Sequence, residues 1–234
     1  MATIIIPARK GSVRLPGKPL LLVKGVPLIV RVYEQAVAAD VGPVFVTSDS
    51  HEILALIPHQ RGVYTSPDCP TGTDRVAAAA RVLQCKDEVI INVQGDMPFV
   101  SPSLIWDFAN FMEETKFQMG TVAIPTSGPV PPGFVSVVTD AFNNAVYFSR
   151  SRQADLTNGH EAPSLRHVGM YGFRAPELQV FSCYGESPLE RQENLEQLRV
   201  IYYDMFPIKV MPTLEDPGPE INTLQDLTEV NNAR

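Results

Sequence analysis

The sequence predicts an α/β fold: a mostly parallel sheet covered by helices on both faces, with a small mixed extension in the second half. Short β-rich runs alternate with helical patterns through the first half, as in chains built from strand–helix–strand units. The strongest strand candidate, Val89–Val93, is almost wholly apolar, which is typical of a strand buried on both faces. The 234 residues, 44% hydrophobic and 19% charged, fit one packed domain. We therefore expect a single domain over 1–234, with a small mixed subdomain at roughly 125–190.

The first half of the chain begins with an apolar strand at residues 3–7. A helix is expected at 27–39, because apolar residues recur there at helical spacing and Pro27 suits a first helical turn. Short apolar runs predict further strands at 44–47, 63–65 and 89–93, with helices between them at 51–56 and 74–83. Strands separated in this way by helices lie parallel.

The second half is less regular. A cluster of Gly and Pro at 128–133 interrupts the alternation, and two hairpin strands are expected after it at 134–139 and 144–148. The polar segment 151–164 predicts a loop. A strand at 167–173, a helix at 188–198, a strand at 208–211 and a last helix at 223–230 complete the prediction.

The charges are distributed unevenly along the chain. The net charge is −7, yet the first 33 residues hold six basic side chains and no acidic one. Four of the six, Arg9, Lys10, Arg14 and Lys18, follow the first expected strand in a glycine-bearing loop. Backbone N–H groups and cations gathered at a sheet edge bind phosphates. The loop therefore predicts a small polyanion such as a triphosphate that loses pyrophosphate; the alternative is a solvated basic turn.

Several other classes of function do not fit. The loop is not a P-loop, because Gly17 and Lys18 are followed by Pro19 rather than by Ser or Thr. A sequence pI near 5.1 argues against nonspecific nucleic-acid binding. No apolar run reaches the ~20 residues that span a bilayer, and no signal peptide is evident, so no membrane partner is expected. The three cysteines form no paired motif, and we expect reduced thiols in the cytoplasm: Cys69, Cys85 and Cys183.

Asp96 is the strongest candidate for a metal ligand. It lies just past the carboxyl end of the strand at Val89–Val93, where open α/β sheets bind their ligands. A carboxylate beside a triphosphate suits Mg²⁺, which takes one or two carboxylates together with phosphate oxygens. The alternative is an aspartate that only caps a helix or a turn.

Six ordered motifs resemble those of the cytidylyltransferases that make CMP-Kdo. They are PAR with RLPGKPL at 7–20, TGTDR at 71–75, NVQGD at 92–96, YFSR at 147–150, RHVGMY at 166–171, and SPLE with LEQLR at 187–199. The resemblance implies a Rossmann-like nucleotidyltransferase fold and a homodimer. It also implies transfer of CMP from CTP to Kdo, a 3-deoxy-2-keto sugar acid used for lipopolysaccharide, with Mg²⁺ as cofactor and pyrophosphate as product.

The same resemblance implies a role for individual residues. The catalytic residues that it implies are Arg9, Arg14 and Lys18, which would hold the triphosphate, and Asp96, which would bind magnesium. The residues implied to bind CTP are Ala8, Arg9, Lys10, Lys18, Thr71, Gly72, Arg75 and Gln94. Those implied to bind a small anionic acceptor are Arg75, Gln94, Arg150, His167, Tyr171, Glu196 and Gln197. Mg²⁺ is expected on Asp96 and Asn222.

Some of these residues have a purely structural alternative. His167 and Tyr171 are four apart on an expected strand, so both side chains face the same side, which favours a shared pocket. Either one could instead belong to the core. Glu196 and Gln197 could simply lie on a helix surface.

The chain departs from the family pattern near the metal and the acceptor. Asn222 stands where the resembling family has its second metal aspartate, Met97 replaces a glutamate, Ser136 replaces a lysine, and SRQA at 151–154 replaces Ile-Pro-Trp. A neutral amide lowers the expected affinity for metal unless the acceptor brings the missing charge. The acceptor therefore stays open between Kdo and another small acid: a modified Kdo, a sialic-type sugar, or a phosphonate such as phosphonoformate. A third alternative is a non-catalytic CTP-binding regulator.

Overall fold

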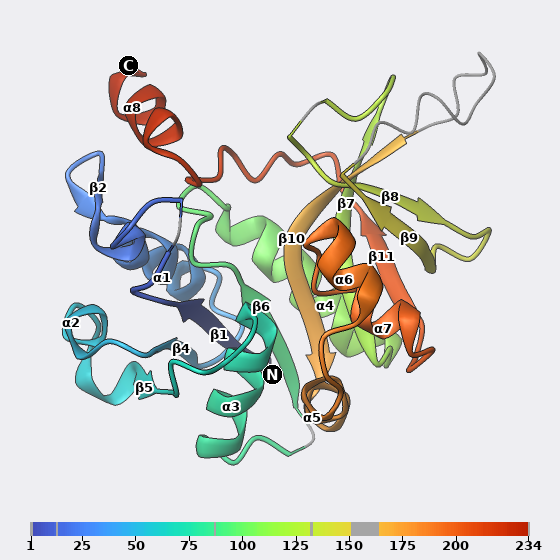
Figure 1. Ribbon diagram of the computed structural model, residues 1–234, viewed down its shortest axis with the longest axis horizontal. Coiled ribbons are helices and arrows are strands. Elements are labelled where there is room, and N and C mark those ends of the chain that lie inside the picture. The colour runs from blue at the N-terminus through green and yellow to red at the C-terminus, as the bar shows by residue number, and fades with distance from the viewer. Residues whose placement is uncertain (1, 13, 87, 132, 151–163, 234) are drawn as a thin grey trace.

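The computed structural model describes residues 2–12, 14–86, 88–131, 133–150 and 164–233. At its centre is a nine-stranded sheet, in which seven strands follow the order β11-β7-β10-β6-β1-β4-β5 (Figure 1). These strands are β1 (Thr3–Ala8), β4 (Val44–Ser48), β5 (Gly62–Tyr64), β6 (Val89–Val93), β7 (Met119–Thr126), β10 (Ser164–Arg174) and β11 (Ile208–Pro212). In this order β10 runs antiparallel to both neighbours, and the other pairings are parallel. The predicted α/β class and its mostly parallel sheet are confirmed.

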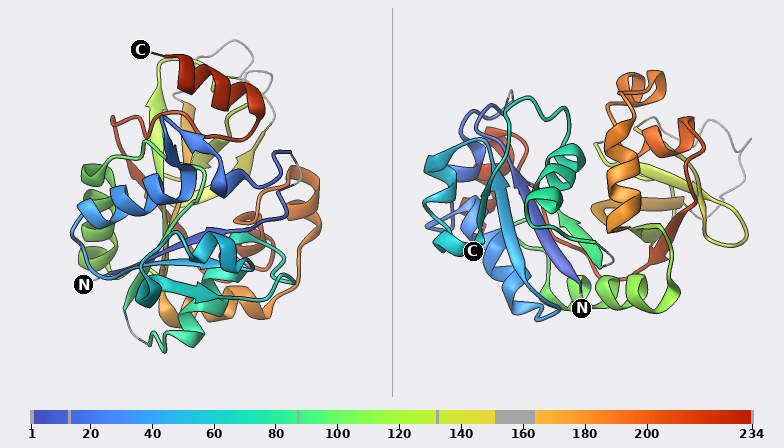
Figure 2. Two further views of the ribbon diagram at one scale, coloured as in Figure 1. Left: turned by 90° about the vertical axis from the view of Figure 1, so that its left-hand side faces the viewer. Right: turned by 90° about the horizontal axis from the view of Figure 1, so that it is seen from below.

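Helices cover both faces of the sheet because its strands are apolar on both sides. In β1, Ile4 and Ile6 pack into one buried cluster and Ile5 into another. The first cluster is covered by α1 (Leu28–Ala38), α2 (His51–Leu54) and α4 (Pro102–Thr115). The second is covered by α3 (Gly72–Val82), α5 (Ala175–Cys183), α6 (Pro188–Glu193) and α7 (Leu198–Tyr202). Figure 2 shows the layers edge-on.

A hairpin extends the same sheet in the second half. Strands β8 (Ser136–Thr139) and β9 (Ala145–Ser149) pair antiparallel, as predicted. Strand β8 also pairs with the first part of β10, where Leu165 lies opposite Val137. The hairpin is thus continuous with the central sheet. Most of the loop expected at 151–164 lies outside the described residues.

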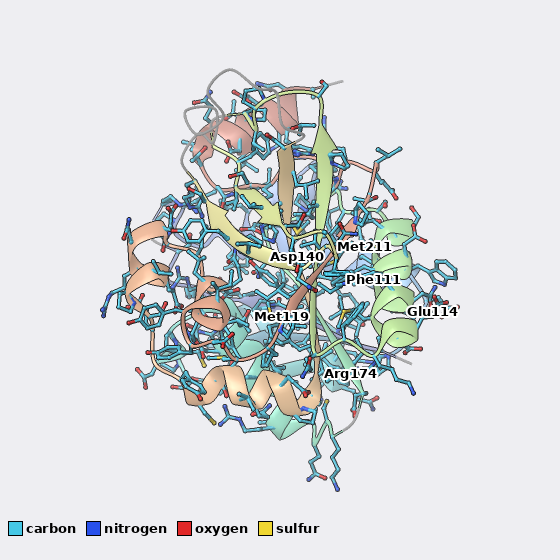
Figure 3. The ribbon with its side chains drawn as sticks, turned by 90° about the vertical axis from the view of Figure 1, so that its right-hand side faces the viewer. Phe111, Glu114, Met119, Asp140, Arg174 and Met211 are labelled. Atoms are coloured by element: carbon cyan, nitrogen blue, oxygen red, sulfur yellow. The ribbon has the colours of Figure 1, made fainter. Side chains whose placement is uncertain are left out.

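Strand β11 forms one edge of the seven-strand order and pairs with β7; Met211 and Met119 mark these two strands in Figure 3. Helix α4, which carries Phe111 and Glu114, lies beside this edge. Arg174 at the end of β10 donates from Nη2 to the backbone oxygen of Met112 at 2.9 Å. This contact ties the antiparallel strand to α4.

The helix predicted at 188–198 is broken into α6 and α7. The break occurs at Asn194, whose φ of 53° is left-handed and ends α6. The helical pattern of apolar residues continues through the break, so local sequence does not reveal it. As a consequence Glu196 and Gln197 lie in the turn between two helices, and the alternative that they occupy a helix surface is wrong: Gln197 is only 1% exposed.

The end of the chain returns to its beginning. After β11 the chain leads to α8 (Leu224–Asn232), which lies against the short ribbon of β2 (Leu22–Val23) and β3 (Val26–Pro27) (Figure 2). The backbone N of Lys24 donates to Asn231 Oδ1 at 2.7 Å, and Val23, Leu28 and Leu227 share a small apolar cluster. This docking places the residues before α8 beside the basic loop. Two 3₁₀ turns, at Lys18–Leu20 and His59–Arg61, complete the elements.

No helix in the described part of the chain has the length and apolar character needed to cross a bilayer.

Candidate active site

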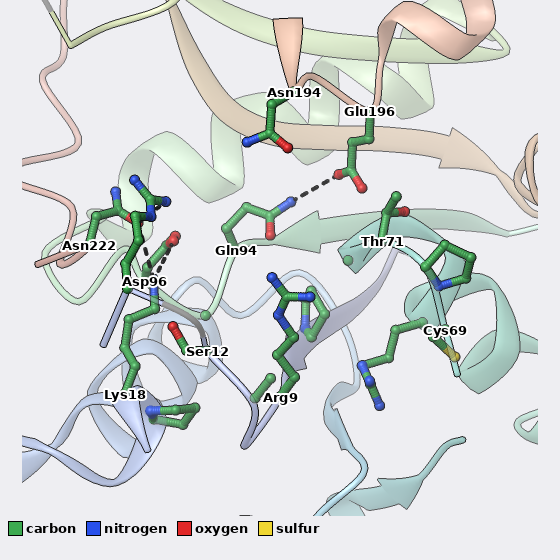
Figure 4. A pocket seen from close by; sticks show the side chains of 18 residues that line it. Arg9, Ser12, Lys18, Cys69, Thr71, Gln94, Asp96, Asn194, Glu196 and Asn222 are labelled. Atoms are coloured by element: carbon green, nitrogen blue, oxygen red, sulfur yellow. Dashed lines mark hydrogen bonds and ion pairs between the residues drawn. The ribbon is translucent and has the colours of Figure 1, made fainter. Parts of the chain in front are cut away.

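A cavity of about 550 Å³ opens where β1 and β6 end (Figure 4). The loop after β6 passes close to β1 there: a side chain on Gly95 would bring its Cβ within 2.6 Å of the backbone oxygen of Pro7. Only glycine allows the loop after β6 to pass β1 so closely. The predicted residues that line the cavity are Ala8, Arg9, Arg14, Lys18, Thr71, Gly72, Arg75, Gln94, Asp96, Glu196 and Asn222.

Five predicted residues do not lie on the cavity wall: Lys10, Arg150, His167, Tyr171 and Gln197. Lys10 points away from it, since its Nζ pairs with Glu52 Oε2 at 2.7 Å. Arg150 is exposed, and its Nε donates to the backbone oxygen of Glu193 at 3.1 Å. The binding roles predicted for these five residues stay predictions.

The basic loop and Asp96 meet inside the cavity. The Nζ of Lys18 lies 2.9 Å from Asp96 Oδ2 and 3.2 Å from Asn222 Oδ1. The Nη2 of Arg14 lies 3.2 Å from the same Asn222 oxygen. Side chains from three distant segments thus converge, and the lysine ammonium occupies a position between two oxygen donors. An arrangement of this kind accepts a cation.

Glu220 belongs to the same group, although sequence reasoning missed it. Its Oε2 accepts from Asn222 Nδ2 at 3.1 Å. Desolvation, with a further contribution from the negative charge of Asp96, raises the pKa of Glu220 to about 7. The sequence did offer a signal: Glu220 lies two residues before Asn222, and Asn222 occupies the position of the second metal aspartate in the resembling family.

The opposite wall of the cavity begins at the amino end of α3. Thr71 caps this helix by accepting from the backbone N of Asp74 at 3.1 Å. The carboxylate of Glu196 accepts from the Thr73 backbone N at 3.1 Å and from Thr73 Oγ1 at 2.8 Å. Desolvation raises the pKa of Glu196. The turn after α6 is therefore held against α3, with Gln94 Nε2 at 3.5 Å from Glu196 Oε1 (Figure 4).

Arg75 is buried beneath this wall, with 2% of its surface exposed. Its Nη1 donates to Thr65 Oγ1 at 2.9 Å, and its Nη2 lies 3.5 Å from Asp49 Oδ2. The guanidinium therefore joins α3 to the residues that directly follow β4 and β5, at the base of the cavity.

His167 and Tyr171 lie side by side, as their spacing predicts, with ring centroids 5.6 Å apart. His167 Nε2 is 2.8 Å from Thr121 Oγ1, and desolvation, with the Arg150 charge adding to it, lowers the pKa of His167 to about 3. Tyr171 Oη donates to Gln197 Oε1 at 2.9 Å. Within the described part of the chain, Gln197 Nε2 is buried and has no hydrogen-bond partner.

The neutral His167 makes stability fall in acid. The unfolded chain takes up a proton as the pH drops below about 6.5, whereas the folded protein stays neutral at this ring down to a pH of about 3. Between pH 7 and pH 5 this single group should remove about 2 kcal/mol of stability. Urea unfolding at both pH values measures this effect. Between pH 7 and pH 5 the free energy of unfolding of the His167→Gln variant should fall by about 2 kcal/mol less than that of wild type.

An equal loss of stability in wild type and His167→Gln would contradict a buried, neutral His167.

Sequence reasoning also missed Ser12, Cys69 and Asn194 on the cavity wall. Ser12 adjoins the basic residues, so its position was available from the loop itself. Asn194 reaches the wall only because the helix breaks at that residue. Cys69, Cys85 and Cys183 are free, and desolvation raises the pKa of Cys69.

Comparisons with known proteins agree with this fold. The family model described as cytidylyltransferase matches residues 3–209. The 3-deoxy-manno-octulosonate cytidylyltransferase of Proteus mirabilis is 38% identical over 240 residues, covering 97% of this chain and 94% of the relative. That of Neisseria meningitidis serogroup A is 39% identical over 242 residues, with 97% and 95% covered. A solved structure of CMP:2-keto-3-deoxy-manno-octonic acid synthetase complexed with CTP superposes with a TM-score of 0.87 and 33% identity, covering 98% and 96%. The chain therefore belongs to the cytidylyltransferase family.

Proposed function

We propose that the protein transfers CMP from CTP to 3-deoxy-manno-octulosonate (Kdo), releasing pyrophosphate and forming CMP-Kdo. One observation carries the proposal: Lys18 of the basic loop lies 2.9 Å from Asp96 within a cavity large enough for a nucleotide. Relatives at 38–39% identity are cytidylyltransferases of this acceptor and support its choice.

Mg²⁺ fits the oxygen donors at this end of the cavity. Asp96 offers a carboxylate and Asn222 an amide oxygen, and the Lys18 ammonium already lies between them. When bound, Mg²⁺ would neutralise charge on the triphosphate. We propose Asp96 and Asn222 as its first protein neighbours.

The mechanism follows from the distribution of charge. An oxygen of the acceptor forms a bond to the α-phosphorus of CTP as the bond to the departing pyrophosphate breaks, so no protein nucleophile is needed. Arg9, Arg14 and Lys18 would hold the triphosphate, and Lys18 would meet the charge that grows on pyrophosphate. The amino end of α3, at Thr71 and Gly72, would hold the cytosine end.

The acceptor would lie between the nucleotide and the turn that carries Glu196. Gln94 and Glu196 face the cavity there. His167, Tyr171 and Gln197 form a buried layer behind the wall. Gln197 Nε2 makes no hydrogen bond to any described residue, so it is a donor available to a ligand that reaches this layer.

We also propose that the enzyme works in the cytoplasm as a homodimer. The β8–β9 hairpin exposes Val138, Phe142 and Val146, and Phe142 is 75% exposed. Exposed apolar side chains gathered on one hairpin favour a protein partner. Light scattering in solution measures the number of subunits directly.

The acceptor is tested by pyrophosphate release with CTP, Mg²⁺ and one acid at a time. We expect release with Kdo and little with a sialic acid or phosphonoformate. If pyrophosphate were released with another acid and not with Kdo, that acid would be the acceptor. CTP binding without pyrophosphate from any acid would instead identify a non-catalytic CTP-binding regulator.

A further inference from the structure

A chain of polar contacts continues past the predicted metal ligands to Glu220. Asp96 Oδ2 accepts from Lys18 Nζ, which also donates to Asn222 Oδ1; the other end of the same amide, Nδ2, donates to Glu220 Oε2 at 3.1 Å. Asn222 thus turns its oxygen toward the cations and its N–H group toward the carboxylate. The second carboxylate at this end of the cavity is that of Glu220. In the resembling family the second carboxylate stands two residues later, at the position of Asn222.

The backbone around Glu220 is fixed in place. The backbone N of Ile221 donates to the backbone oxygen of Asp96 at 3.0 Å, and the Ile221 side chain is fully buried. On the other side, the backbone N of Asn222 donates to Asp226 Oδ2 at 2.8 Å, in the capping box of α8. Glu220 is therefore anchored next to Asp96 rather than carried on a loose loop.

The Glu220 carboxylate also faces β10. A Cβ built on Gly169 would lie 3.8 Å from Glu220 Oε1 and 3.8 Å from Cγ of Gln94, a residue of the cavity wall. Because Gly169 has no side chain, this oxygen approaches the strand next to the cavity. The carboxylate is thus directed toward the same end of the cavity as Asp96.

Two carboxylates at a triphosphate site are unfavourable unless a cation lies between them, because each repels the phosphates. Among the described residues no group of three or more Asp, Glu, His or Cys side chains gathers that would hold a metal alone. A site with two carboxylates and substrate phosphates is the arrangement that Mg²⁺ takes in nucleotide enzymes.

We propose that Glu220 is the second anionic metal ligand of this enzyme and replaces the carboxylate that Asn222 lacks. The inference rests on the proposed function, since the metal would be shared with CTP. When CTP binds, the Lys18 ammonium would form an ion pair with its phosphates. The carboxylates of Asp96 and Glu220 would then be available to bind the metal. Asn222 would then orient Glu220 through its Nδ2.

The test measures metal binding rather than turnover. Mn²⁺ is titrated into the full-length protein with saturating α,β-methylene-CTP, which cannot release pyrophosphate, and free Mn²⁺ is counted by electron paramagnetic resonance. The Glu220→Gln variant keeps the side-chain shape and removes the charge, and we expect Mn²⁺ to bind it at least about tenfold more weakly. Glu229→Gln, the same change on the exposed side of α8, should bind Mn²⁺ as wild type does.

Moving the charge back gives a second readout. Asn222→Asp in the wild-type background should tighten Mn²⁺ binding. The double variant Glu220→Gln with Asn222→Asp should recover to within about threefold of wild type, because it restores two carboxylates at the site. Circular dichroism melts of each variant show that the fold is retained.

Unchanged Mn²⁺ affinity in Glu220→Gln would overturn the proposal, as would a double variant no better than the single one. Tighter binding of the nucleotide analogue by Glu220→Gln, with metal affinity unchanged, would show that Glu220 only repels phosphate. If wild type released no pyrophosphate with any acid, the proposed function would fail while the Mn²⁺ comparison still decided the role of Glu220.

Discussion

Replacing Lys18 by alanine should lower kcat for pyrophosphate release by about 10²- to 10³-fold. Lys18 is the cation that lies closest to Asp96, at 2.9 Å, and its side chain is only 15% exposed. In the proposed reaction negative charge grows on pyrophosphate as it leaves, and a positioned ammonium stabilises that charge most in the transition state. Steady-state kinetics with CTP and the acceptor measure the loss.

The fold should tolerate the Lys18 change, because the residue begins a short 3₁₀ turn and is not part of the core. Lys86→Ala is a matched control: Lys86 is exposed and precedes β6 at the edge opposite the cavity. It should leave kcat unchanged. A Lys18→Ala variant with wild-type kcat would show that the basic loop does not act on the triphosphate.

Replacing Arg199 by methionine should lower the free energy of unfolding by about 3–5 kcal/mol. The guanidinium is 1% exposed and makes paired contacts with two carboxylates, at 2.9 and 3.1 Å to Asp74 and at 2.8 and 3.0 Å to Glu190. Removing it leaves two buried carboxylates without a cation. Urea unfolding at pH 7 measures the change.

The exposed Arg191 provides the comparison. It faces Glu186 at 3.8 Å with both side chains largely in solvent, so Arg191→Met should change stability by less than about 1 kcal/mol. A similarly small change in Arg199→Met would mean that the buried contacts of Arg199 with Asp74 and Glu190 contribute no more to stability than a surface ion pair. The result also bears on the site, because Asp74 belongs to the helix end that forms one cavity wall and Arg199 to the helix after Glu196.

The parallel half of the fold was predictable because its signals are local. Runs such as Val89–Val93 are apolar on consecutive positions, and the loops that follow them carry Gly, Arg and Asp in short motifs. Parallel strands bring their carboxyl ends to one edge, so the convergence of Lys18 with Asp96 follows from topology once the strands are known. Helix α4 is absent from the sequence prediction although its signals are present: Ser101 accepts from the backbone N of Leu104, and Pro102 begins the helix.

The remaining features depend on contacts between distant segments. The break at Asn194 brings Glu196 to Thr73, 123 residues earlier, and no local pattern reports that contact. Glu220 enters the site because α8 docks on the amino-terminal ribbon, which the sequence shows only as two unrelated segments. His167 was predicted to share a pocket with Tyr171, but it is buried and does not line the cavity. The alternation of a strand indicates on which face of the sheet a side chain lies, but it does not indicate which residues pack over that face.

A crystal of the protein grown with Mn²⁺ and α,β-methylene-CTP tests most directly whether one nucleotide and one metal share the cavity. We expect the triphosphate beside Arg9, Arg14 and Lys18, and an anomalous Mn²⁺ peak within about 2.5 Å of a carboxylate oxygen of Asp96. A nucleotide bound elsewhere, or a metal remote from Asp96, would contradict the proposed site.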